Sequence, residues 1–131
     1  MSLHVRPFLM FQGEADAAIT LYTTVFPEAA VDVIARHGPE AGDKAGTVMR
    51  ATFTIGGQSV MCFDSPPVHA FTFTPSFSFF VDCESEAQLR QFAAALGEGG
   101  TVMMAIGNHG FSRLFTWLSD RFGVSWQLNL P

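Results

Sequence analysis

Basic residues are scarce in this sequence, and lysine is almost absent. The chain has 131 residues, with seven Lys and Arg against twelve Asp and Glu, and its one lysine is Lys44. The resulting charge of −5 opposes binding to nucleic acids and to anionic membrane surfaces, because both are negatively charged. We therefore expect neither a nucleic-acid partner nor a membrane partner.

Long apolar runs and a cysteine framework are also missing. No apolar run approaches the roughly 20 residues that a membrane-spanning helix needs. The two cysteines, Cys62 and Cys83, lack the spacing of metal ligands and fit a reduced cytoplasm better than a disulfide-bonded protein. The sequence thus predicts a cytoplasmic protein.

Aromatic residues are abundant by contrast. The chain has 14 Phe, and 48% of its residues are hydrophobic, which is far too many for a disordered segment. This composition predicts one packed domain.

Two segments have apolar residues at helical spacing and acidic residues in the first turn, residues 14–26 and 84–96. The Gly-rich segment 37–46 is predicted to be a loop. Within residues 47–55, alternation places Met49, Ala51, Phe53 and Ile55 on one face of a strand. Strands are predicted at residues 7–12, 30–36, 47–55, 58–63, 76–81, 101–106, 112–118 and 124–130.

The predicted elements follow the order β-α-β-β-β twice. PFLMF at residue 7 aligns with SFSFF at residue 76, and Gly57 aligns with Gly123. We therefore expect a single domain, residues 1–131, with modules at 5–64 and 76–130 and a connector at 65–75. The predicted fold class is α+β, with two tandem βαβββ modules forming curved mixed sheets around a cleft. The alternative is an ordinary α+β sandwich whose halves are alike by chance.

Two segments carry a family resemblance that covers nearly the whole chain. FLMFQGEADAAITLYTTVFPEA near the start and WLSDRFGVSWQL near the end resemble the PhnB-like branch of the vicinal oxygen chelate superfamily. That superfamily includes glyoxalase I, bleomycin-resistance proteins and extradiol dioxygenases. The resemblance implies a cleft in each module and a homodimer, and some PhnB-like proteins carry a demethylubiquinone methyltransferase label.

The resemblance also implies where a divalent metal ion would bind, at Pro7, near Met61, at Ser76 and at Gln127. Of these residues only Gln127 is a plausible ligand for a hard cation. A methyl donor would need a Gly-rich turn between a strand and a helix, whereas GEGG at 97–100 follows a helix. We therefore predict no metal ion and no cofactor.

A small-molecule pocket is the remaining candidate site. Alternation places Ser125 and Asn129 beside Gln127, and the Arg113 guanidinium suits an anionic or carbonyl-bearing ligand. Apolar walls with a few polar groups are typical of such pockets, although the aromatic residues could instead fill a sealed core. With the lining implied by the resemblance, the predicted ligand-binding residues are Leu9, Phe53, Met61, Ser76, Ser78, Arg113, Phe115, Trp117 and Gln127.

Single reactive residues add little to this prediction. Cys62 is expected to face a helix as an inert thiol, whereas Cys83 precedes a helix whose N-terminus could lower its pKa. Asp64 is predicted to be a solvated turn carboxylate, and His69 lies in the connector as a candidate general base.

The leading hypothesis is binding of a small, partly apolar organic ligand in a metal-free cleft. One alternative is a lyase or isomerase of the vicinal oxygen chelate superfamily that uses Gln127 with His69 or Asp64. The other is a homodimeric interaction module with a vestigial cleft.

Overall fold

The computed structural model describes residues 2–131, and the chain divides into two compact units, Met1–Thr72 and Phe73–Pro131. Each unit contains one α-helix and a four-stranded sheet. The first unit comprises β1 (Phe8–Phe11), α1 (Ala15–Val25), β2 (Ala30–Arg36), the 3-10 helix η1 (Pro39–Lys44), β3 (Val48–Ile55) and β4 (Gln58–Asp64). The second comprises β5 (Ser78–Asp82), α2 (Glu86–Gly97), β6 (Thr101–Gly107), β7 (Leu114–Ser119) and β8 (Ser125–Leu130).

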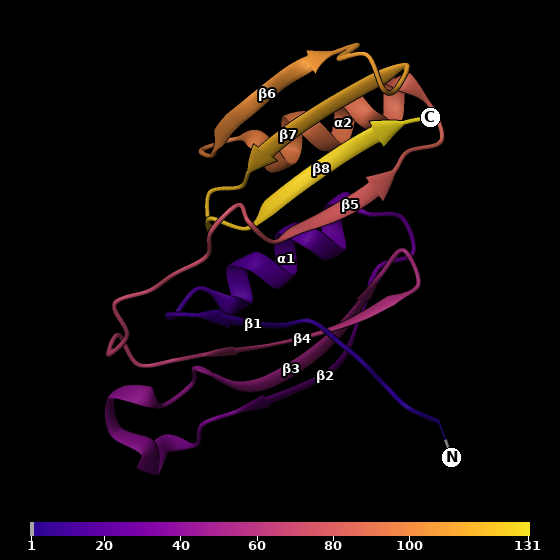
Figure 1. Ribbon diagram of the computed structural model, residues 1–131. Helices are drawn as coiled ribbons and strands as arrows, with labels where there is room; N and C mark the ends of the chain where they lie inside the picture. The colour runs from indigo at the N-terminus through magenta and orange to yellow at the C-terminus, as the bar shows by residue number, and fades with distance from the viewer. Residues whose placement is uncertain (1) are drawn as a thin grey trace. The chain divides into compact units, whose positions relative to one another are not determined.

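The two sheets have the same topology (Figure 1). The strand orders are β1-β4-β3-β2 and β5-β8-β7-β6. The first and last strands of each unit pair in parallel, and the other neighbouring strands pair antiparallel. Within residues 2–131 neither sheet closes into a barrel. The predicted α+β fold class is therefore confirmed, and an internal duplication remains our interpretation of the repeated order.

Helix α1 packs on the first sheet through one apolar stripe. Its buried residues Ala15, Ala18, Ile19 and Tyr22 follow helical spacing, and the Tyr22 ring lies 6.0 Å from the ring of Phe53 on β3. The helix ends before Pro27, because proline disfavours helical geometry in the residue that precedes it.

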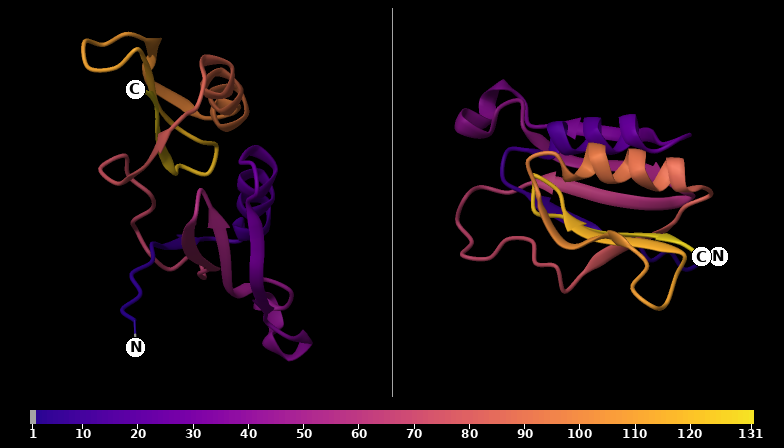
Figure 2. Two further views of the ribbon diagram at one scale, coloured as in Figure 1. Left: turned by 90° about the vertical axis from the view of Figure 1, so that its right-hand side faces the viewer. Right: turned by 90° about the horizontal axis from the view of Figure 1, so that it is seen from above.

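Helix α2 begins with a side-chain cap and packs on the second sheet. The Ser85 hydroxyl accepts a hydrogen bond from the Gln88 N–H at 3.1 Å, and the Gln88 side chain reaches back to the Glu84 N–H at 2.8 Å. Its buried residues Leu89 and Phe92 face β7 and β8, the strands that the helix contacts. Figure 2 shows helix α2 on one face of this sheet.

Several strand details differ from the sequence prediction, and two of them have a structural reason. Met49 was expected beside Ala51, but Met49 is exposed, because the pairing of β2 and β3 shifts between Ala35 and Arg36 and leaves Met49 without a partner in the register. Such a bulge reverses the alternation of faces locally. Strand β5 starts at Ser78 rather than at residue 76, since the preceding residues form a turn closed by the Phe77 N–H on the Thr74 carbonyl.

Asp64 is buried and anchors the start of helix α1, which corrects the expectation of a solvated carboxylate. Its Oδ1 accepts hydrogen bonds from the Gly13 N–H at 2.9 Å and the Ala15 N–H at 3.0 Å. Its Oδ2 accepts from the Val48 N–H at 3.1 Å. Glu14, at the N-cap, makes no capping bond through its own side chain, so Asp64 performs this task from the end of β4.

We predict that Asp64→Asn lowers the free energy of unfolding by about 2–3 kcal/mol, because it removes a charged acceptor from three backbone donors, of which those of Ala15 and Val48 are buried. Urea unfolding followed by circular dichroism measures this change. Asp32→Asn is the matched control, since Asp32 is exposed and accepts one hydrogen bond from Thr54. Equal stability losses in the two variants would contradict the anchoring role of Asp64.

Candidate functional site

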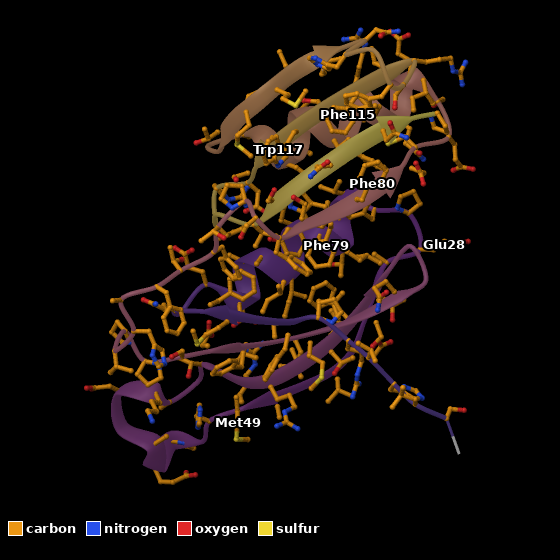
Figure 3. The ribbon with its side chains drawn as sticks, in the orientation of Figure 1. Glu28, Met49, Phe79, Phe80, Phe115 and Trp117 are labelled. Atoms are coloured by element: carbon orange, nitrogen blue, oxygen red, sulfur yellow. The ribbon has the colours of Figure 1, made fainter. Side chains whose placement is uncertain are left out.

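The face of the second sheet opposite helix α2 gathers polar and aromatic side chains in three rows. We call it the helix-free face. Residues directly opposite one another on neighbouring strands project from the same face of a sheet. From β5 across β8 to β7, the rows are Ser78–Ser125–Ser119, Phe80–Gln127–Trp117 and Asp82–Asn129–Phe115. Figure 3 labels Phe80 on β5 and Phe115 and Trp117 on β7.

A chain of four side chains joins the first two rows. The Trp117 indole Nε1–H donates to the Ser125 Oγ at 2.8 Å, and the Ser125 and Ser78 hydroxyls are 2.6 Å apart. The Gln127 Nε2–H donates to the Ser78 Oγ at 3.2 Å. Each link orients the next, so the Trp117 ring and the Gln127 carboxamide are held in fixed positions.

The third row forms a separate network. The Asn129 Nδ2–H donates to Asp82 Oδ1 at 2.9 Å, and the Asn129 Oδ1 accepts a hydrogen bond from the Ser112 hydroxyl. Both polar atoms of the Asn129 side chain are thus used within the protein, which leaves this row with less free hydrogen-bonding capacity than the Gln127 row.

Aromatic rings extend the apolar part of this face. Phe115 is only 3% exposed, and its ring lies 4.8 Å from Phe111 and 6.4 Å from Phe80. Phe80 and Phe111 are 58% and 60% exposed. The His109 ring lies 6.1 Å from Phe115, and its Nε2 is 2.8 Å from the Ala105 carbonyl. The face therefore offers exposed rings around a buried one.

The structure brings together four of the predicted ligand-binding residues on this face, Ser78, Phe115, Trp117 and Gln127. Sequence reasoning missed Phe80, although strict alternation from Ser78 along the same strand would have found it. Two further predicted residues lie outside the rows. Ser76 is exposed in the turn before β5, where its hydroxyl lies 2.6 Å from that of Thr74, and the Arg113 Nε donates to the Pro131 carbonyl at 2.8 Å.

The remaining predicted residues belong to the first unit and lie on different faces of its sheet. Leu9 pairs with Cys62 and both are buried, and Phe53 is buried against Tyr22. Leu9 and Phe53 are therefore core residues beneath helix α1, whereas they were predicted to line a cleft. Met61 is half-buried and lies opposite Thr52 in the β3–β4 register, on the other face.

The side chains do not fit the divalent metal site that the resemblance implies. Pro7 and Met61 offer no hard donor, and the Ser76 hydroxyl pairs with Thr74 in an exposed turn. Among residues 2–131 no three His, Cys, Asp or Glu side chains gather as a metal-binding group. His69 stacks on Phe71 at 4.8 Å and is exposed.

Asp64, the alternative to His69 in the lyase or isomerase hypothesis, is also committed elsewhere. Both carboxylate oxygens of Asp64 accept backbone hydrogen bonds, as described above. The carboxylate is thus part of the packing of the first unit.

The strand-to-helix turns lack the Gly-rich sequence that a methyl donor would need. The β1–α1 turn has one glycine, Gly13, and the β5–α2 turn, Cys83–Ser85, has none. The GEGG segment instead ends α2, and a Cβ added at Gly100 would lie 2.0 Å from the Ser119 carbonyl oxygen. Gly100 therefore permits a close approach of two chain segments.

Burial suppresses the reactivity of both cysteines. Desolvation raises the pKa of Cys62 to about 12, and nearby Asp64 adds to the rise. Desolvation also raises the pKa of Cys83 to about 11, although a backbone hydrogen bond from Asn129 acts in the opposite direction. The pKa of Cys83 is therefore raised, contrary to the expectation of a lowered value at the helix N-terminus, and loss of hydration is the largest cause.

The two mixed four-stranded sheets, each with one helix, define a protein of the glyoxalase/bleomycin-resistance fold. The 3-demethylubiquinone-9 3-methyltransferase family model matches residues 4–129, and the chain belongs to that family. No curated protein matches the chain. Neither α-helix within residues 2–131 is long and apolar enough to cross a membrane.

Solved structures agree with this assignment. A PhnB protein from Bacillus cereus is 42% identical, with 98% of this chain and 100% of that chain covered and a TM-score of 0.94. Protein PA1353 from Pseudomonas aeruginosa is 27% identical, with 98% of both chains covered and a TM-score of 0.85. The fosfomycin resistance protein FosX from Mesorhizobium loti shares the fold at 11% identity, with 100% and 93% covered and a TM-score of 0.59.

We predict that both thiols of the folded protein react with iodoacetamide at pH 8 on the order of 100-fold more slowly than the same thiols of the protein unfolded in urea. The thiolate is the nucleophile, and little thiolate is present when the pH is well below the raised pKa. Mass spectrometry of Cys62→Ser and Cys83→Ser follows each thiol separately. The rate should climb as the pH approaches 11. Alkylation of Cys83 in the folded protein at the rate seen in urea would show that this thiol is neither buried nor raised in pKa.

Proposed function

We propose that the protein binds a small, partly apolar organic molecule on the helix-free face of its second sheet and that this binding needs no metal ion. The observation that carries the proposal is the Phe80–Gln127–Trp117 row, which sets a polar group between two aromatic side chains. Apolar walls with a few fixed polar groups are typical of small-molecule sites. The proposal includes membership of the vicinal oxygen chelate superfamily.

The energetics favour such a ligand because part of the aromatic surface is available. The Phe80 ring is more than half exposed, so a ligand that covers it removes apolar area from water, at roughly 25 cal/mol per Å². The Trp117 ring is fixed by the hydrogen bond to Ser125, so little of its freedom remains to be lost on binding.

Other functions of this family find less support in the side chains. Methyl transfer would require a donor site, and the strand-to-helix turns lack the glycines that hold a nucleotide-like donor. Lyase or isomerase chemistry would need an acid–base group, and the Asp64 carboxylate is occupied by backbone donors.

The proposal also retains the homodimer that the family resemblance implies. Phe8 and Val33 are exposed large apolar residues on strands of the first unit. Exposed apolar surface of this kind is typical of protein interfaces.

The test uses the neutral fluorescent probe N-phenyl-1-naphthylamine. Its fluorescence should rise saturably on titration with the protein, because the probe leaves water for an apolar surface. Phe80→Ala should weaken binding by about 1–2 kcal/mol, which is roughly 5- to 30-fold in Kd. EDTA should leave the Kd unchanged.

Phe71→Ala is the matched control, because Phe71 is 59% exposed but lies in the first unit. It should change the Kd by less than about twofold. Equal effects of the two substitutions, or loss of binding in EDTA, would contradict the proposed site.

A further inference from the structure

The Gln127 carboxamide has hydrogen-bonding capacity that the protein does not use. A carboxamide offers two N–H donors and a carbonyl acceptor. One Nε2–H is donated to the Ser78 Oγ, and within residues 2–131 no other side-chain hydrogen bond is made by Gln127. One N–H donor and the Oε1 acceptor therefore remain, both in the plane of the amide. Exchanging the amide nitrogen and oxygen keeps a donor and an acceptor available.

This spare donor–acceptor pair lies between two aromatic residues. Phe80 on β5 and Trp117 on β7 are the direct neighbours of Gln127 in the register. Directly opposite side chains in antiparallel pairs have Cβ atoms about 4.5–5.5 Å apart, so a planar molecule that meets the carboxamide also meets a ring. The Asn129 side chain differs from that of Gln127, because both polar atoms of the Asn129 amide already form hydrogen bonds within the protein.

The charge on this face favours a neutral ligand. Asp82 is the charged member of the three rows, and it lies one row from Gln127. Arg113 precedes the first residue of β7, and its Nε is engaged by the Pro131 carbonyl. A carboxylate ligand at Gln127 would meet an acceptor oxygen and a nearby like charge, without a cation in the same row.

We propose that Gln127 selects neutral planar aromatic molecules that carry a carboxamide or lactam edge, with a donor and an acceptor side by side. This inference rests on the proposed function, because it specifies the ligand class for the same face. The carbonyl oxygen of the ligand accepts a hydrogen bond from the free Gln127 N–H, and the ligand N–H donates one to Gln127 Oε1. The aromatic ring of the ligand packs on Phe80 or Trp117. An ester of the same shape leaves Oε1 without a donor.

The experiment compares three probes with one ring system, naphthalene-2-carboxamide, methyl naphthalene-2-carboxylate and naphthalene-2-carboxylate. Each probe displaces N-phenyl-1-naphthylamine from the wild-type protein, which gives three Kd values. The carboxamide should bind about 5- to 10-fold more tightly than the ester, as one additional hydrogen bond to a neutral group provides. The carboxylate should bind no more tightly than the ester.

Gln127→Met tests whether this side chain makes the distinction. Methionine keeps a similar length but offers no amide, so the carboxamide and the ester should bind within about twofold of each other. Thermal unfolding checks that the variant is folded. The comparison of the three probes on the wild-type protein tests the inference even if Gln127→Met does not fold.

The outcomes separate this inference from the proposed function. Equal binding of carboxamide and ester, with Phe80→Ala still weakening both, would overturn the inference and leave the proposed function intact. Tightest binding of the carboxylate would also overturn it and would favour recognition by Arg113. If all three probes bind Phe80→Ala and Phe71→Ala equally well, both proposals fail together.

Discussion

The parallel pairing of the first and last strands within each unit is the constraint on which the rest of the structure depends. Parallel neighbours need a long connection between them, and here a helix and two antiparallel strands provide it. The helix covers one face of each sheet, so residues of the two faces acquire different roles. In β8 the alternation places Trp126 and Leu128 in the buried core and Gln127 on the helix-free face.

The charged residues most deeply buried in the two units perform structural tasks. Asp64 holds the start of helix α1 and the start of β3 through backbone N–H groups. Asp120 accepts hydrogen bonds from the Phe122 and Val124 N–H groups and from the Trp126 indole, and so fixes the turn between β7 and β8. The side chains of the Phe80–Gln127–Trp117 row are neutral, so the recognition proposed there depends on the Gln127 amide and the two aromatic rings.

Much of the fold follows from local sequence patterns. Helical spacing and the Pro27 and GEGG breaks predicted both α-helices, and alternation placed Ser125, Gln127 and Asn129 on one face. Local patterns did not reveal interactions between distant residues. The partners of Asp64 at Gly13 and Ala15 are 51 and 49 residues away, so its anchoring role required the folded structure.

Alternation also divides a strand into two faces without saying which one meets the helix. For this reason the sequence led to Phe53 as a lining residue, whereas its contact with Tyr22 places it in the core. The pKa of Cys83 illustrates the same limit, because the helix N-terminus is visible in the sequence and the burial of the thiol is not. The ligand-binding role of the predicted residues stays a prediction.

The central claim is that ligands bind the helix-free face beside Gln127, and the two tryptophans test it directly. Trp117 lies on that face and bonds to Ser125, whereas the Trp126 indole bonds to Asp120. The measurement is a 1H–15N spectrum of protein labelled at the tryptophan indole nitrogens, titrated with naphthalene-2-carboxamide. The account predicts that the Trp117 indole resonance shifts with saturation while that of Trp126 stays in place. A bound probe that shifts Trp126 alone, or neither resonance, would contradict it.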